Sequence, residues 1–276
     1  MTQQTKTNNI SSKTHKRLSV QVSLTGLSFL AYTEDRQIDA FIEVAIGRSA
    51  TPEELLDNLQ QTLIEHKELQ GPFEKVMITY STNIYTIVPA ALFDESKASD
   101  YLKFNSKILG NDYIAHDWVE NHEMVTVYVP FMNINNFLFE RFGSFEYYHS
   151  TTHLLQYVLR KNKNTEVANV YIQIEQGFFN LVVTKSGKLQ LCNSFSYHSP
   201  EDFLYYILFA FEQLELNPDT VSTFVIGNIT DEHDLYEIAY KYIRNIAFVE
   251  DSCMPRIGND VPPHFNFIQK LALQCV

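Results

Sequence analysis

Two short turns in this 276-residue chain carry residue types that could hold a phosphate group. The first is Leu24-Thr25-Gly26 and the second is Glu175-Gln176-Gly177, and each joins two apolar segments. Glycine lets the backbone approach a ligand closely, so that N–H groups can surround phosphate oxygens. A carboxylate such as Glu175 can hold Mg²⁺ or its bound waters. The alternative is that both glycines only satisfy the geometry of two tight hairpins.

The first turn lies in a series of three predicted strands over residues 18–24, 27–33 and 37–44. A helix follows, with Thr51 as its N-cap, Pro52 at its first position and two acids next. Leucines recur at helical spacing to about residue 69, where Gln70-Gly71-Pro72 ends the helix. The next predicted elements are strands at 75–80, 84–88, 113–116, 124–129 and 144–149, and helices at 93–105, 130–142 and 151–161.

The second turn lies in a similar series that begins after the polar segment 161–165. Three strands at 170–175, 178–184 and 188–195 precede a helix that starts with Ser199-Pro200-Glu201-Asp202. A strand at 221–226, a helix at 232–243, a strand at 246–250 and a helix at 265–275 follow. The order β-β-β-α-β-α therefore occurs twice. We expect a flexible tail over 1–17, a first half over 18–164 with an insertion at about 81–149, and a second half over 165–276.

This duplicated order resembles the actin, sugar kinase and Hsp70 superfamily, in which two ribonuclease H-like halves enclose ATP. The resemblance implies an α/β protein with an actin-like ATPase fold. It places the two turns at the phosphate loops and the segment 224–228 at the adenosine-binding motif. By position, it implies seven residues that contact the cofactor: Thr25, Gly26, Glu175, Gln176, Gly177, Gly227 and Asn228.

More closely, the chain resembles the uncharacterised domain-of-unknown-function family 3822, which has an actin-like ATPase fold. The similar segments are 18-LSVQVSLTGLSF-29, 88-VPAALFDESKASDYLKFN-105, 128-YVPFMNINNFLFERFGSFEYYHS-150 and 223-TFVIGNI-229. The characterised proteins of a similar type are the actin-like cytoskeletal and pilus-assembly scaffolds, which often bind partner peptides and polymerise. The resemblance identifies a family and does not imply an activity.

The chain departs from the superfamily pattern at the positions that matter most for catalysis. Leu24 stands where an acid would help to hold magnesium, and Asn228 replaces the second glycine of the adenosine motif. Glycine is also scarce, at 9 residues in the chain. We expect a non-catalytic scaffold or adaptor with a degenerate nucleotide cleft, no cofactor, no catalytic residue and no metal ligand. The alternative is a nucleotide-dependent ATPase or kinase that binds ATP and uses Glu175.

Charge and cysteine content limit the partners and the compartment. The net charge is −12, and the first 17 residues hold four of the 21 bases but none of the 33 acids. So acidic a body is a poor partner for nucleic acid and suits a protein partner. No apolar run reaches the ~20 residues needed to span a membrane, and the opening segment lacks the apolar core of a signal peptide. Cys192, Cys253 and Cys275 are far apart, which favours a reduced, cytoplasmic protein.

A histidine pair is the strongest candidate for a metal site. His149 and His153 stand four positions apart, and Glu146 could supply a third ligand. The alternative is a polar residue at a strand end followed by an ordinary helix residue. Cys192 lies in a strand pattern and is expected to pack as a small buried side chain.

Two further polar groups have structural interpretations. Asp112, His116 and Asp117 form a cluster that we expect to lie in a solvated loop. Asn135 and Asn136 are expected to bond nearby backbone, although the aromatic residues around them would also suit the rim of a partner-binding surface.

Overall fold

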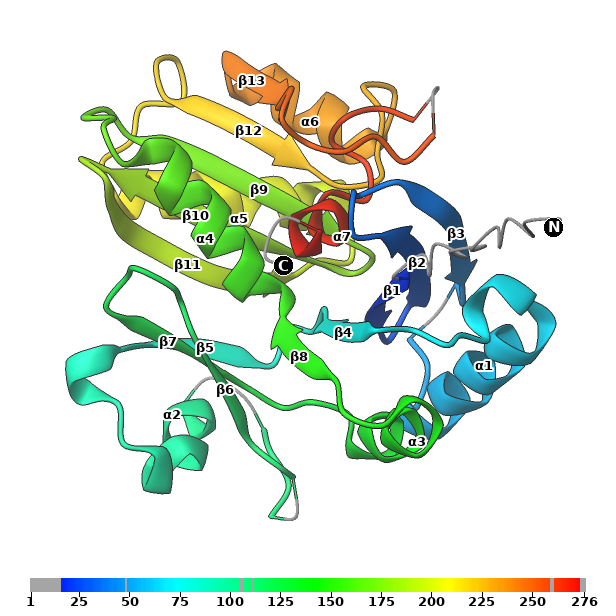
Figure 1. The fold of residues 1–276 in the computed structure, drawn as a ribbon. Coiled ribbons are helices and arrows are strands. Elements are labelled where there is room, and N and C mark those ends of the chain that lie inside the picture. Colours follow the sequence, from blue (N-terminus) through cyan, green and yellow to red (C-terminus); the bar gives the residue numbers. More distant parts are fainter. Residues whose placement is uncertain (1–15, 48, 105–106, 111, 259–260, 274–276) are drawn as a thin grey trace, which may run out of the picture.

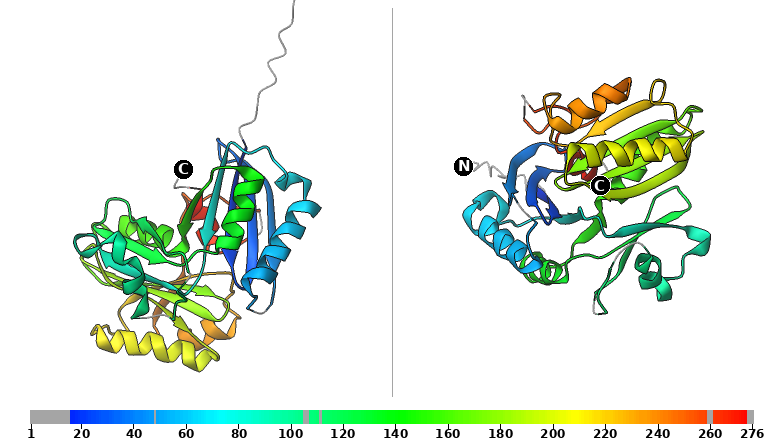
Figure 2. Two further views of the ribbon diagram at one scale, coloured as in Figure 1. Left: turned by 90° about the horizontal axis from the view of Figure 1, so that it is seen from below. Right: turned by 180° about the vertical axis from the view of Figure 1, so that it is seen from behind.

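The computed structural model describes residues 16–276 apart from 48, 105–106, 111, 259–260 and 274–276 (Figure 1). Within these ranges the fold contains two five-stranded sheets, and a three-stranded sheet lies beside them. Helices cover the outer faces of the two larger sheets and also lie between them (Figure 2). The result is a layered α/β arrangement in which the two large sheets are the repeated unit.

The first large sheet has the strand order β3-β2-β1-β4-β8. Its strands are β1 (Lys16–Ser23), β2 (Gly26–Thr33), β3 (Ile38–Ala45), β4 (Lys75–Tyr80) and β8 (Glu146–His149). The first three strands are antiparallel, whereas β4 runs parallel to both β1 and β8. Lys16 and Arg17, which the sequence assigns to the tail, open β1 and pair with β2. The rest of the predicted tail, residues 1–15, lies outside the described residues.

The second large sheet repeats this order as β11-β10-β9-β12-β13. Its strands are β9 (Asn169–Glu175), β10 (Phe178–Lys185), β11 (Lys188–Ser196), β12 (Ser222–Ile226) and β13 (Asn245–Phe248). Here too the first three strands are antiparallel and the last two run parallel to β9. The duplicated order of strands in the sequence therefore corresponds to two sheets with the same topology.

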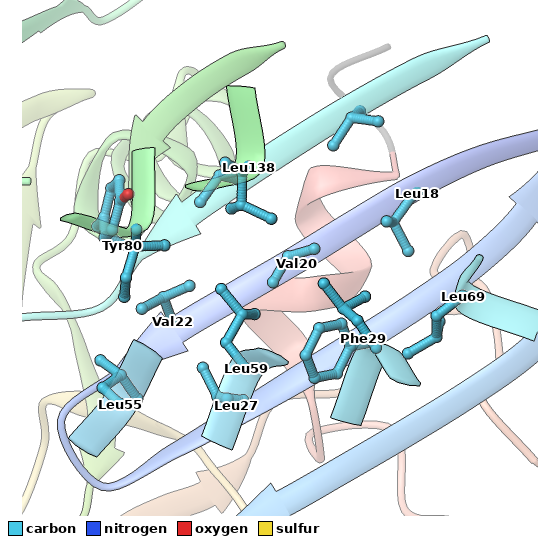
Figure 3. Packing of buried hydrophobic residues seen from close by; sticks show 14 of the residues in the cluster. Leu18, Val20, Val22, Leu27, Phe29, Leu55, Leu59, Leu69, Tyr80 and Leu138 are labelled. Carbon is cyan, nitrogen blue, oxygen red and sulfur yellow. The ribbon is translucent and has the colours of Figure 1, made fainter. Parts of the chain in front are cut away.

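Helix α1 (Pro52–Glu65) covers the outer face of the first sheet together with α3 (Met132–Phe142). Its start matches the sequence pattern, because Thr51 Oγ1 accepts a bond from Glu54 N and Glu54 in turn bonds Thr51 N. Figure 3 shows Leu18, Val20 and Val22 of β1 directed toward this helix. Each such buried aliphatic side chain contributes about 2 kcal/mol to folding. The helix ends at residue 65, before a 3₁₀ turn at Lys67–Leu69, and not near residue 69 as the leucine spacing predicts.

Helices α5 (Pro200–Gln213) and α6 (Asp234–Tyr242) cover the outer face of the second sheet. Ser199 caps α5 through a bond from Asp202 N, as its sequence predicts. Phe203, Ile207 and Phe211 of α5 are buried against this sheet. The outer layers of the two halves are therefore built in the same way.

The two inner helices are exchanged between the halves. Helix α4 (Ser150–Asn162) follows a strand of the first sheet but packs against β10 of the second. Helix α7 (Phe267–Ala272) follows the second sheet but packs against β1 and β4 of the first, and Gln269 Nε2 donates to Ser19 O at 2.9 Å. The two helices also contact each other (Figure 1, α4 in green and α7 in red). Each half therefore supplies part of the other half's core.

The third sheet, of order β5-β7-β6, lies within the segment 81–149 in which an insertion is expected. It consists of β5 (Tyr85–Pro89), β6 (Ala115–Trp118) and β7 (Met124–Tyr128), with α2 (Ala98–Lys103) packed on it. The single helix predicted over 93–105 is wrong. A 3₁₀ turn at Ala90–Leu92, an extended Phe93 and a second 3₁₀ turn at Glu95–Lys97 precede α2. The Asp94 side chain starts that second turn by accepting a bond from Ser96 N.

Candidate functional site

A cavity of about 440 Å³ lies between the two halves and contains most of the residues expected at a nucleotide site. Strands β1, β2 and β3 line it from one side, and the ends of β9 and β12 line it from the other. Six of the seven expected residues line this cavity: Thr25, Gly26, Glu175, Gln176, Gly227 and Asn228. The seventh, Gly177, has a φ of +86° and occupies the turn behind them, where it satisfies hairpin geometry.

Glu175 lies at the end of β9, where its carboxylate joins the two halves. Its Oε1 accepts bonds from Ser81 Oγ at 2.8 Å and from Gln173 Nε2 at 2.6 Å. Burial raises the pKa of Glu175, and the carboxylate of Glu43 raises it further, whereas the bonds from Ser81 and Gln173 oppose this rise. Glu175 is therefore already engaged by protein donors inside the cavity.

A chain of buried hydrogen bonds continues from Glu175 into the protein. Asn180 Nδ2 of β10 donates to Gln173 Oε1, and Tyr85 OH of β5 donates to Asn180 Oδ1 at 2.9 Å. Tyr85 belongs to the three-stranded sheet, so the chain connects the cavity with that sheet. The sequence gives no signal for this connection, because the residues come from three separate strands and from the segment after β4.

The first turn is held by bonds within the protein, and one of its backbone donors is already in use. Thr25 N already donates to Ser23 Oγ at 3.3 Å. The carbonyls of Leu24 and Thr25 accept bonds from Ala50 N and Ile46 N, so the segment after β3 closes over the turn. A Cβ at Gly26 would lie 2.8 Å from the carbonyl oxygen of Val44. This glycine is therefore required by strand pairing, independently of any ligand.

The expected adenosine motif is held in a similar way. Asn228 Nδ2 donates to Glu43 Oε1 at 3.1 Å and to Asn266 Oδ1 at 2.9 Å, and Asn228 Oδ1 accepts a bond from Asn266 N at 2.7 Å. Gly227 has a φ of +142°, and a Cβ there would lie 2.7 Å from the carbonyl oxygen of Ile174. Asn228 thus bridges the first half to the chain just before α7, and Gly227 permits close packing on β9.

Gln176 makes another bridge across the cavity, because its Nε2 donates to Gly47 O at 3.2 Å. The charge of the cavity is also unsuited to free phosphates. Glu43 and Glu175 line it from opposite halves, and no Lys or Arg is among the described residues that line it. Burial raises the pKa of Glu43 as well. A triphosphate without a bound cation would be repelled by these two carboxylates.

The histidine pair is a buried structural feature. Burial lowers the pKa of His149 to about 3 and that of His153 to about 4, so both rings are neutral near pH 7. Glu146, the expected third ligand, is exposed and forms an ion pair with Lys75 at 3.1 Å. Across the part of the chain that the structure describes, no three His, Cys, Asp or Glu side chains are placed to hold a metal ion.

The prediction that Asp117 lies in a solvated loop is wrong, because this residue is buried in β6. Its carboxylate accepts bonds from Tyr128 OH at 3.0 Å, His149 N at 2.7 Å and Thr152 Oγ1 at 2.8 Å. Burial raises its pKa to about 6 despite these donors. Asp117 thereby joins the three-stranded sheet to β8 and α4.

Other polar and thiol groups have structural roles too. The ring of His116 lies on Phe93, while Asp112 accepts a bond from Leu109 N. The interpretation of Asn135 as a backbone-binding residue is also wrong, since its Oδ1 accepts a bond from Tyr80 OH at 2.6 Å. Cys192 is partly buried in β11, with its Sγ 3.8 Å from Tyr85 OH. Cys275 lies outside the described residues.

Comparison with known proteins agrees with this geometry. A family model described as a protein of unknown function, DUF3822, matches residues 5–246. A Bacteroides thetaiotaomicron protein described as having an actin-like ATPase fold and unknown function has a similar structure, with a TM-score of 0.82 and 22% identity. The match covers 97% of this chain and 99% of that one. The predicted family and the actin-like fold are therefore confirmed.

Two more distant structures share the fold. A PilM-PilN type IV pilus biogenesis complex gives a TM-score of 0.53 at 12% identity, over 84% of this chain and 88% of that chain. The ethanolamine utilization protein EutJ from Carboxydothermus hydrogenoformans gives 0.50 at 8% identity, over 94% and 88%. No curated protein sequence matches the chain. In the described ranges, no helix has the length and apolar character required to cross a membrane.

Proposed function

We propose that this chain, which belongs to the DUF3822 family of proteins of unknown function, is a non-catalytic scaffold or adaptor with a degenerate nucleotide cleft. The observation that carries this proposal is that the polar side chains of the cleft already form hydrogen bonds between the two halves. Glu175, Gln176 and Asn228 stand where nucleotide contacts are expected, and each bonds a residue of the opposite half. A nucleotide entering this site would have to replace those bonds.

The electrostatics of the cleft support the same conclusion. Phosphoryl transfer depends on backbone donors, cations and magnesium to stabilise the phosphates. Here Thr25 N is used internally, Leu24 offers no ligand for a metal, and the two acidic side chains have raised pKa values. These features suit a cleft that holds two halves together.

A protein partner fits the remaining properties of the molecule. The chain has a net charge of −12, which favours basic protein surfaces and disfavours nucleic acid. One structural neighbour is a PilM-PilN type IV pilus biogenesis complex, and this likeness motivates the proposal that the chain binds another protein. The scaffold would act in the reducing cytoplasm, in keeping with three cysteines at scattered positions.

The alternative function is a nucleotide-dependent ATPase or kinase, and the carboxylate of Glu175 in the cavity favours it. Isothermal titration with Mg·ATP separates the two functions. We expect no binding at millimolar ATP by the wild type. Micromolar binding that requires magnesium and is lost in Glu175→Gln, but kept in the exposed control Glu212→Gln, would overturn the scaffold proposal.

A second measurement tests the scaffold directly. Native mass spectrometry of the protein, isolated from its own cells under mild conditions, should show a stable complex with another protein. Recovery of the monomer alone would count against a scaffold role, whatever the result with ATP.

A further inference from the structure

A second cavity, of about 430 Å³, lies at the opposite end of α7 from the first. Its lining residues are Arg17, Tyr32, Glu34, Arg36, Lys75 and Leu273. Three of them form a row across adjacent strands, because Arg17 of β1 pairs in register with Tyr32 of β2 and with Lys75 of β4. Paired residues point to the same face of a sheet, so these side chains face one space.

Positive charge dominates this cavity in an otherwise acidic protein. Arg17 Nη2 lies 3.3 Å from Glu34 Oε1, and Lys75 Nζ lies 3.1 Å from Glu146 Oε2. Arg36 forms no ion pair with any residue that the structure describes. The guanidinium of Arg36 is therefore the cation of this cavity whose charge is not compensated by an ion pair, and it attracts a negatively charged group.

One buried donor in the cavity lacks a partner among the described residues, because Nε of Arg17 is buried and has no acceptor there. Tyr32, whose side chain is only 2% exposed, lines the same cavity. Tyr32 and Arg17 are register partners on β2 and β1. Burial raises the pKa of Tyr32, the charges of Arg17 and Arg36 lower it, and the charge of Glu146 raises it. A buried donor without an acceptor is costly, and an acceptor from outside the chain would satisfy Arg17 Nε.

Arg36 is held in an unusual backbone conformation. It has a φ of +62° in the turn between β2 and β3, where Arg36 N donates to Thr33 O at 2.9 Å. The third residue of such a turn is usually glycine, because a side chain is strained there. Arg36 adopts this strained conformation, and its guanidinium lines the cavity.

We propose that this cavity binds a small oxyanion, a phosphate or a carboxylate, through the guanidinium groups of Arg17 and Arg36 and the hydroxyl of Tyr32. Guanidinium groups bind such planar or tetrahedral oxyanions through two parallel hydrogen bonds. A cationic ligand would be repelled, and an apolar one would leave the donors unsatisfied. The anion could be free or could be a group carried by another molecule. The site is distinct from the cleft between the halves and does not depend on the scaffold proposal.

Isothermal titration of the full chain with inorganic phosphate tests the site. We expect saturable binding that weakens at least tenfold in Arg36→Ala and by less in Arg36→Lys, which keeps the charge but loses the planar fork. Lys188→Ala, an exposed cation on β11, is the control and should bind like the wild type. Absence of binding of both phosphate and acetate up to millimolar concentrations, or equal affinity in Arg36→Ala and the control, would overturn the proposal.

Parallel titrations with acetate and with a phosphoserine peptide distinguish a free ion from a carried group. Tighter binding of the peptide than of inorganic phosphate would identify a phosphorylated partner, and preference for acetate would identify a carboxylate. In each case Tyr32→Phe should weaken binding several-fold, since it removes only the hydroxyl. Unchanged affinity in Tyr32→Phe would show that the buried phenol does not contact the anion and would contradict the proposed geometry.

Discussion

Ser81 Oγ, directly after β4 in the first half, donates a hydrogen bond of 2.8 Å to Oε1 of Glu175 in the second half. Ser81 is 1% exposed, and its backbone N–H bonds Val22 O, so its side chain has a fixed position. This bond brings together residues that are 94 positions apart and closes the inner end of the cleft.

Replacement of Ser81 by alanine tests how much this bond stabilises the fold. Glu175 would keep only the bond from Gln173, and we expect the free energy of unfolding to fall by about 2 kcal/mol, the usual range for a hydrogen bond to a charged group. Urea denaturation measures the change. The exposed Ser252→Ala is the control, with a change within about 0.5 kcal/mol. Equal stability of the two variants would show that the halves do not depend on this bond.

The glycine of the adenosine motif offers a second prediction. Gly227→Ala should lower the free energy of unfolding by about 3 kcal/mol, because the new Cβ would meet Ile174 O at 2.7 Å and φ is +142°. Gly47→Ala is the matched control, since Gly47 also has a positive φ but no atom within 4 Å of a new Cβ. It should cost only about 1 kcal/mol. Similar losses in both variants would mean that the contact with Ile174 relaxes easily.

Asp117 predicts a specific dependence of stability on pH. Its pKa is about 6 in the folded protein and 3.8 for an ordinary aspartate, because burial favours the protonated form. As pH rises from about 4 to about 6, the unfolded chain releases this proton before the folded protein does. The wild type should therefore lose about 3 kcal/mol of stability relative to Asp117→Asn across this window, and nothing more above it.

The histidines act in the opposite direction, so the comparison with Asp117→Asn is essential. His149 and His153 have folded pKa values of about 3 and 4, against an ordinary value of 6.5, so both add stability as pH rises toward 6.5. These contributions are present in both proteins and cancel in the difference. Denaturant titrations at several pH values provide that difference. A constant difference from pH 4 to pH 7 would show that Asp117 is ionised normally.

Arg36 predicts a conflict between stability and binding. Arg36→Gly should raise the free energy of unfolding by about 1 kcal/mol, because glycine adopts the observed φ of +62° without strain. The same variant should lose phosphate binding. Asp35→Gly, in the same turn but without a positive φ, should not be stabilised. A less stable Arg36→Gly protein would show that the arginine makes stabilising contacts within the fold.

The sequence predicts the repeated part of the fold well because local signals specify it. The starts at Thr51 and Ser199 combine a capping side chain with a following proline, and both helices begin there. The two hairpins with Gly26 and Gly177 also form as expected. The sequence also predicts where the cleft residues lie, because they stand at the ends of strands in a duplicated order. Six of the seven line one cavity.

The parts that could not be predicted depend on distant contacts. Asp117 is buried only because Tyr128, His149 and Thr152 supply donors from three other elements. The sequence places Arg17 in a polar tail, since nothing in the neighbouring sequence shows that β2 and β4 pair beside it. The polar bridges that occupy the cleft join residues far apart in sequence, and single-sequence patterns contain no information about such pairs.

The exchange of α4 and α7 has a consequence for biosynthesis. A ribosome completes every strand of the first sheet well before it reaches α7, so one face of that sheet must wait uncovered. On β1 the waiting face carries Arg17, Ser19 and Gln21, whereas Leu18 and Val20 point to the side that α1 covers early. The waiting face is thus polar on β1, but Leu30 of β2 and Met77 of β4 pair with Ser19 and lie on the same side. These two apolar side chains stay uncovered in the nascent first half until the closing helix is made.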